Sequence, residues 1–112
     1  MSGTVTFNRN CDFRRLYGRG KSYTNPALVI YFQRNRAGIC RIGITVSKKI
    51  GNAVQRNRSK RVIRAAFRNL EPQIQGNWDF VFVARSKTKY LKSTEIEKIM
   101  LEQFQKAGAI KE

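Results

Sequence analysis

The residues of this chain that could do chemistry are cations, and they gather in one stretch. The 58 residues from Phe13 to Leu70 contain no aspartate or glutamate and hold 15 of the 23 lysines and arginines. The densest part reads KKIGNAVQRNRSKRVIRAAFR, from Lys48 to Arg68. Charge of one sign, kept together in a folded domain, repels itself unless a partner of opposite sign relieves it. The stretch therefore predicts binding of a polyphosphate, and its many arginines, which contact phosphate bidentately and stack on bases, favour RNA.

Groups that could catalyse a reaction by themselves are absent or scattered. The chain has no histidine, which is the commonest general base and metal ligand. The seven acidic residues are dispersed, and only Asp79 falls inside a predicted strand, without an acidic neighbour in sequence. A metal-dependent nuclease needs a carboxylate cluster to hold Mg²⁺, and no glycine-rich phosphate loop is present. If the chain works in an enzyme, another component must supply the reactive centre.

Composition sets limits on the class of protein. The length of 112 residues and the 41% hydrophobic content predict one domain, residues 1–112, with one modest core. No apolar run is long enough to span a bilayer, so we expect no membrane partner. The N-terminal residues lack the apolar centre of a signal peptide, which predicts a cytoplasmic location. Cys11 and Cys40 are then expected to be reduced thiols, with a disulfide as the alternative.

One long helix must position most of the cations. It is predicted to start at Gly51 and Asn52 and to run to about Asn69. At ~100° per residue its apolar side chains cluster on one side and most of its polar ones on another, with Arg56 on the boundary and Arg58 pointing away. The helix can therefore pack on a sheet and still present a cationic ridge. The ridge consists of Asn57, Lys60, Arg61, Arg64 and Arg68, and Lys48 and Lys49 extend it.

A plain solvated face is the alternative interpretation of this ridge. Solvated helix faces normally mix both signs, with Glu and Lys paired four residues apart. This helix has no acidic residue with which to form such pairs, so we favour a binding surface.

Three strands and two further helices complete the expected fold. Strands are predicted at Ala27–Phe32, at Cys40–Ser47 and at Trp78–Ala84, the last apolar on both faces and therefore inside the sheet. A first helix around Phe13 to Tyr17 should end near Gly18. A last helix should begin with a capping box of Thr94 and Glu97. The pattern predicts one sheet with helices packed on it.

Three aromatic residues could form a second binding surface. Phe13 and Tyr17 are one turn apart on the first helix, and Tyr31 lies on the strand face opposite Leu28, Ile30 and Phe32. If the first helix flanks that face, unpaired nucleotides could stack on these rings at about 1–3 kcal/mol per base. The alternative is that Phe13 belongs to the buried stripe of its helix. Small residues of the next strand would floor the cleft: Gly43, Thr45 and Ser47.

The stretch RIGITVSKKIGNAVQRNRSKRVIRAAFR (Arg41–Arg68) resembles the protein subunit of bacterial ribonuclease P nearly throughout, including the RNR element at 56–58. Supporting matches are the CDF…LY pattern at Cys11–Tyr17 and the strand ending in VAR at Val83–Arg85. The resemblance implies an α+β sandwich of about four strands in a mixed sheet with three helices. It also implies a left-handed βαβ crossover through the basic helix, against a right-handed rule that holds in about 98% of cases.

The family resemblance also implies function. The protein would bind the catalytic ribonuclease P RNA and the single-stranded 5′ leader of precursor tRNA, with no small-molecule substrate. The RNA subunit, holding most of the Mg²⁺, would cut the phosphodiester and leave the mature 5′ end. The protein would be the non-catalytic subunit of this endonuclease, which agrees with its lack of catalytic groups.

Family roles carry over to matching positions of this chain. The RNA-facing residues would be Lys48, Lys49, Arg56, Asn57, Arg58, Lys60, Arg61, Arg64 and Arg68, and the leader cleft would comprise Phe13, Tyr17, Tyr31 and Ser47. Ser59 departs from the family, which usually has an apolar residue there, and it lies on the apolar side of the helix. Looser packing of the helix is therefore expected.

Two other functions share the charge and size. A structural ribosomal protein would be equally basic. A double-stranded DNA reader could also use the basic helix, although no clear two-helix turn precedes it and no dimer signal is visible.

Overall fold

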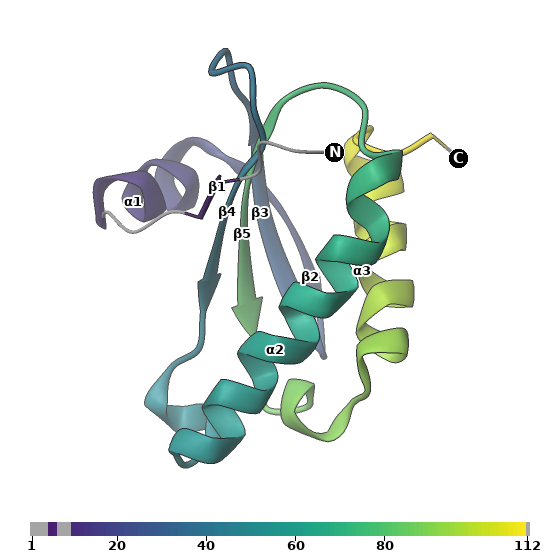
Figure 1. Ribbon diagram of the computed structural model, residues 1–112. Coiled ribbons are helices and arrows are strands. Elements are labelled where there is room, and N and C mark those ends of the chain that lie inside the picture. The colour runs from purple at the N-terminus through teal and green to yellow at the C-terminus, as the bar shows by residue number, and fades with distance from the viewer. Residues whose placement is uncertain (1–4, 7–9, 112) are drawn as a thin grey trace.

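A computed structural model describes residues 5–6 and 10–111, and its five strands form one mixed sheet (Figure 1). The strands are β1 (Val5–Thr6), β2 (Lys21–Asn25), β3 (Leu28–Arg34), β4 (Arg41–Thr45) and β5 (Trp78–Ala84). Their order across the sheet is β1-β4-β5-β3-β2. β4 is parallel to β1 and β5, whereas β3 is antiparallel to β5 and to β2. The four longer strands are the mixed sheet that was expected, and β1 adds two residues at its edge.

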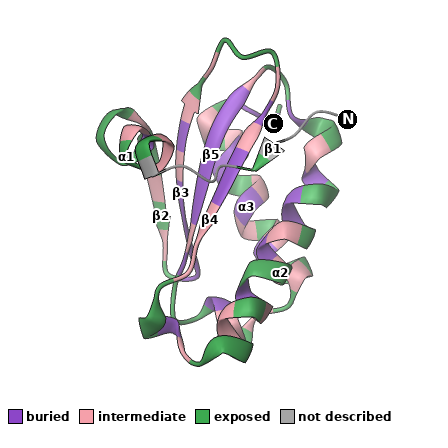
Figure 2. Cartoon of the chain, turned by 60° about the vertical axis from the view of Figure 1, so that its left-hand side comes forward, coloured by how far each residue is buried: buried purple, intermediate pink, exposed green. Residues whose placement is uncertain are grey.

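Three helices complete the α+β fold: α1 (Asn10–Arg19), α2 (Ala53–Leu70) and α3 (Ser93–Ala107). Three short 3₁₀ turns lie between the elements: η1 (Lys48–Ile50), η2 (Glu71–Gln73) and η3 (Thr88–Tyr90). α2 and α3 lie side by side on one face of the sheet, and α1 covers the other face (Figures 1 and 2). The expected sandwich with three helices is thus confirmed.

The crossover from β4 through α2 to β5 is left-handed. In Figure 1 both strands run downward, β5 lies to the right of β4, and α2 returns upward in front of the sheet. A right-handed crossover would place α2 on the face that α1 covers. The left-handed crossover, which was expected only from the family resemblance, therefore determines which face of the sheet carries the basic helix α2.

The main core lies between the sheet and the pair α2 and α3. Phe67, Phe80, Phe82 and Phe104 are among its largest buried side chains, and the rings of Phe80 and Phe104 are 4.7 Å apart. Fully burying such a side chain contributes about 1.5–3 kcal/mol. β5 is buried on both faces between β4 and β3 (purple in Figure 2), as its continuous apolar run predicted.

β2 was missed by the sequence analysis. Its residues are mostly polar and exposed, because it is an edge strand that pairs only with β3. The predicted boundaries of the neighbouring elements also need correction. β3 begins at Leu28 and continues to Arg34, and β4 is shorter than predicted and ends at Thr45. α1 runs through Gly18, and the chain turns at Gly20, where a Cβ would lie 2.7 Å from the Leu16 carbonyl oxygen.

The start of α2 is defined by side-chain capping. Asn52 accepts a hydrogen bond from the Gln55 backbone N–H at 2.9 Å, and the Gln55 side chain accepts from the Asn52 N–H at 3.0 Å. Gly51 has a positive φ of 151°, and a Cβ there would collide with the Gln55 side chain. Two backbone donors at the start of the helix are thereby satisfied, which fixes where the cationic helix begins.

The capping of α3 differs from the prediction. The helix starts at Ser93, and Glu95 accepts a hydrogen bond from the Lys92 backbone N–H at 3.2 Å. The predicted box of Thr94 and Glu97 is therefore wrong, because the helix begins earlier than the apolar pattern indicated. Both cysteines are unpaired as expected, Cys11 exposed and Cys40 buried. Burial raises the pKa of the Cys40 thiol above its usual 9.0.

Candidate nucleic-acid interface

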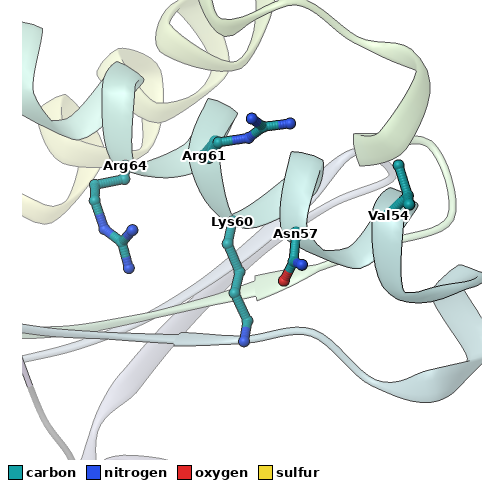
Figure 3. A pocket seen from close by; sticks show the side chains of 5 residues that line it. All are labelled: Val54, Asn57, Lys60, Arg61 and Arg64. Carbon is teal, nitrogen blue, oxygen red and sulfur yellow. The ribbon is translucent and has the colours of Figure 1, made fainter.

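The cationic ridge of α2 faces solvent. Asn57, Lys60, Arg61 and Arg64, together with Val54, line a shallow hollow of about 430 Å³ (Figure 3). In Figure 3, Asn57, Lys60 and Arg64 extend from the same side of the helix, whereas Arg61 leaves it in another direction. Arg68 is exposed further along α2. The structure therefore brings together five of the predicted RNA-facing side chains.

No carboxylate within the described part of the chain forms an ion pair with this ridge. The three ion pairs found there join Arg15 and Arg41 to Asp12 and Asp79. Two acidic residues of α3 have other partners, since Glu95 caps its own helix and Glu97 accepts from the Asn69 amide at 2.8 Å. The ridge cations keep their charge available for an external anion.

Lys48 and Lys49 extend the cationic surface beyond the start of α2. Both are exposed on η1, and Ser47, which precedes that turn, is exposed as well. The Lys89 ammonium donates to the Ile50 carbonyl at 2.7 Å and so ties η3 to η1. The two lysines thus stand on a segment that is anchored at its buried residue Ile50.

Arg56 and Arg58 are half-buried and have protein partners, whereas Lys60, Arg61 and Arg68 of the ridge are exposed. The Arg56 guanidinium donates to the Gly51 carbonyl at 2.8 Å. The Arg58 guanidinium donates to the carbonyls of Lys89 at 2.8 Å and of Leu91 at 3.1 Å. Arg58 therefore fastens α2 to the segment that carries η3. Direct RNA contact by these two arginines stays a prediction.

The predicted aromatic residues do come together on the α1 face of the sheet. The rings of Tyr17 and Tyr31 meet edge to face at 4.9 Å, and those of Phe13 and Tyr17 are 6.4 Å apart. The Tyr17 hydroxyl shares a hydrogen bond of 2.9 Å with the Thr45 hydroxyl. Tyr17 is 42% exposed, while Phe13 and Tyr31 are half-buried against the cluster of Leu16 and Val81. Phe13 thus takes part in packing and keeps some surface.

A buried carboxylate beside these rings was not recognised as a structural centre from sequence. Asp79 is 1% exposed and accepts hydrogen bonds from Arg15 at 2.7 Å, from Arg41 at 2.8 Å and from Asn35 at 2.7 Å. The hydrogen bond to Asp79 is the largest cause that raises the pKa of Arg41. Because Arg15 belongs to α1, the network holds the aromatic helix against the sheet. The lone acidic residue in a buried strand was the available signal, since such a charge requires partners.

Ser59 is fully buried, and its hydroxyl donates to the Gln55 carbonyl at 3.0 Å. Its polar group is therefore satisfied within α2. Among residues 5–6 and 10–111 no group of three or more His, Cys, Asp or Glu gathers as a metal site would require. In the same ranges no helix is both long and apolar enough to cross a membrane.

Comparisons with known proteins agree on one family. The ribonuclease P family model matches residues 1–108. The ribonuclease P protein component of Clostridium botulinum (strain Loch Maree / Type A3) is 43% identical over 101 residues, which cover 89% of this chain and 91% of that protein. The RNase P protein of Staphylococcus aureus superposes with a TM-score of 0.83 at 34% identity, covering 94% of this chain and 96% of the other. The RNase P protein of Thermotoga maritima superposes with a TM-score of 0.76 at 29% identity, covering 85% of this chain and 90% of the other. The chain therefore belongs to the family of ribonuclease P protein components.

Proposed function

We propose that this chain binds the catalytic RNA of ribonuclease P and the single-stranded 5′ leader of precursor tRNA. In doing so it assists the endonucleolytic removal of the leader, which gives the mature tRNA 5′ end. The family assignment supports this role over that of a ribosomal protein or a DNA reader. The proposal places this work in the cytoplasm.

The observation that carries the proposal is the unpaired ridge of α2. Lys60, Arg61 and Arg64 project from a helix whose opposite side is packed in the core through Ile63 and Phe67. A rigid row of cations suits the regular spacing of phosphates, and each contact releases counterions from the nucleic acid. About six such contacts give a salt slope near −4 to −5.

The aromatic group on the other face suits the unpaired leader. Bases of a single strand have free faces and stack on rings such as Tyr17 and Tyr31, whatever their sequence. Tyr17 offers the largest exposed surface of the three aromatics. α1 and the sheet together hold these rings, so the leader would meet a preformed surface.

Chemistry is left to the RNA subunit in this proposal. Hydrolysis of a phosphodiester with Mg²⁺ requires oxygen ligands gathered around the ion. Of the two acidic residues on the α1 side, Asp12 contacts Arg15, and Asp79 is buried under Arg15 and Arg41. Phosphate oxygens of the RNA are better placed to coordinate Mg²⁺ than the carboxylates of Asp12 and Asp79, which are already paired with arginines. The chain's own part is to bind and orient its RNA partners.

A reconstitution tests the proposed function. Catalytic RNA and precursor tRNA are mixed at low Mg²⁺ with and without the chain, using precursors whose leaders differ in length. We expect faster cleavage and tighter precursor binding, both growing with leader length until the cleft is filled. If the chain changes neither quantity, or acts equally on leaderless tRNA, the proposal is wrong. A ribosomal protein would instead co-sediment with ribosomal particles.

A further inference from the structure

A second cationic hollow lies toward the β3 and β2 edge of the sheet, and no residue of α2 lines it. It encloses about 380 Å³, within the range of about 300–1,000 Å³ that is usual for small-ligand sites. Its cations are Arg19, Lys21 and Arg34, and its apolar wall is formed by Phe32 and Trp78. Gln33 also lines it. The mixture of cations, an amide and aromatic rings matches the chemistry of a nucleotide.

The three cations of the hollow come from three elements. Arg19 is the last residue of α1, Lys21 is the first of β2, and Arg34 is the last of β3. The register of the sheet sets Lys21 opposite Phe32 and Arg34 opposite Trp78. The hollow is thus built on paired strands, which hold its walls at fixed spacing.

The three cations have no ion-pair partner among the described residues. The ion pairs of the described residues join Asp12 and Asp79 to Arg15 and Arg41. Arg19, Lys21 and Arg34 are all exposed. Three like charges around one hollow repel one another, and an anion placed between them relieves that repulsion.

The apolar wall gives the site a stacking surface. The Arg34 guanidinium lies 4.9 Å from the centre of the Trp78 ring system. Trp78 also stacks on Phe80, with a centroid distance of 5.9 Å and an interplanar angle of 12°. Trp78 and Phe32 are each only 4% exposed. The planar guanidinium of Arg34 is therefore the outermost layer of a stack and can take a base on its outer side.

We propose that this hollow binds one nucleotide of an RNA strand, with the phosphate between Arg19 and Lys21 and the base against Arg34. The proposal rests on the proposed function in so far as the partner is RNA. α2 packs over β4 and β5, whereas the cations of the hollow lie on β2, on β3 and at the end of α1. RNA would therefore contact the protein at two places that share no residue, and the hollow would add a contact that the α2 ridge cannot make.

Trp78 is the only tryptophan of the chain and lines the hollow, so its fluorescence reports occupancy directly. The chain is titrated with a short single-stranded RNA, with a mononucleotide and with inorganic phosphate. The test variant carries Arg19→Gln and Lys21→Gln. The control carries Lys92→Gln and Lys98→Gln, two exposed lysines outside the hollow, and loses the same charge. Thermal melts check that both variants fold.

We expect RNA to change the Trp78 fluorescence saturably and more tightly than the mononucleotide or phosphate. In the test variant the salt slope of this response should become shallower by about 1.4, which is about 0.7 for each lost contact with a single strand. The control variant should keep the parent slope. Bound RNA without a Trp78 response, or equal losses in the two variants, would overturn the proposal. Saturation by mononucleotide at the same concentration as by RNA would overturn the assignment to RNA.

The proposed function is tested independently of this second site. Its reconstitution depends on the α2 ridge and the aromatic residues, none of which line this hollow. A chain that stimulates cleavage but gives no Trp78 response retains the proposed function and loses the second site. A Trp78 response without stimulation gives the reverse outcome.

Discussion

The guanidinium of Arg41 and the buried carboxylate of Asp79 form a two-pronged ion pair. Arg41 Nε donates to Asp79 Oδ1 and Nη2 donates to Oδ2, both at 2.8 Å. Asp79 also accepts from Arg15 of α1 and from Asn35 of the turn before β4. One side chain thus links α1, β4 and β5. Phe13 and Tyr17 lie on α1, so this network holds two of the three aromatic residues against the sheet.

Replacement of Asp79 should destabilise the protein strongly. Asp79→Asn removes the negative charge and leaves two guanidinium groups facing each other without compensation, so we expect about 3 kcal/mol less stability against unfolding. The matched control is Asp12→Asn, whose partly buried pair with Arg15 lies within one helix turn; this variant should lose less than about 0.5 kcal/mol. Urea denaturation measures both. Equal effects would contradict the central role of Asp79.

Arg61 and Arg64 should contribute to RNA affinity and not to stability. Both residues line the solvent-facing hollow of α2 and form no ion pair with any residue that the structure describes. Arg61→Ala and Arg64→Ala should each make the salt slope of RNA binding shallower by about one unit. Slopes that stay at the parent value would remove these residues from the contact surface.

Arg58 should behave differently from Arg64 although both lie on α2. Arg58→Ala leaves the carbonyls of Lys89 and Leu91 without their charged donor, so the free energy of unfolding should fall by about 1–3 kcal/mol. Arg64→Ala, the control, should change stability by less than about 0.5 kcal/mol. If Arg58→Ala keeps full stability but weakens RNA binding as Arg64→Ala does, Arg58 acts on RNA instead.

The aromatic residues should discriminate between precursor and mature tRNA. Tyr31→Ala removes a ring that could stack on a leader base, and about 1.4 kcal/mol lost corresponds to about tenfold weaker precursor binding. Phe13→Ala should act in the same direction. Binding of mature tRNA, which lacks a leader, is the control and should not change. Equal losses on the two substrates would reject the cleft.

Much of this fold can be predicted from the pattern of apolar residues, but some elements cannot. β5 has the predicted bounds because its run is apolar throughout, and α2 starts within a residue or two of Asn52 because its cap is encoded locally. β2 escaped notice because an exposed edge strand has no apolar alternation to detect. The capping of α3 by Glu95 was not predicted, because Glu95 and Glu97 both lie in the first turns of the helix and either could cap it.

Long-range partners limit what the sequence shows of the site. The spacing of Lys60, Arg61 and Arg64 predicts one exposed face, because a helix fixes its own geometry. Asp79 and Arg15 are 64 residues apart in sequence, and Arg58 and Lys89 are 31 residues apart. Neither pairing produces a periodic pattern in the sequence from which it could be predicted. The hollow at Trp78 likewise depends on strand register.

A crosslinking map of the leader onto the chain tests the central claim most directly. Precursor tRNA with photoreactive nucleotides in the leader is bound to the chain and catalytic RNA, irradiated and digested. The account predicts crosslinks from leader nucleotides to the peptides that contain Phe13, Tyr17 and Tyr31, and from catalytic RNA to those of Lys60 to Arg68. Leader crosslinks confined to α3, with none on α1 or β3, would contradict it.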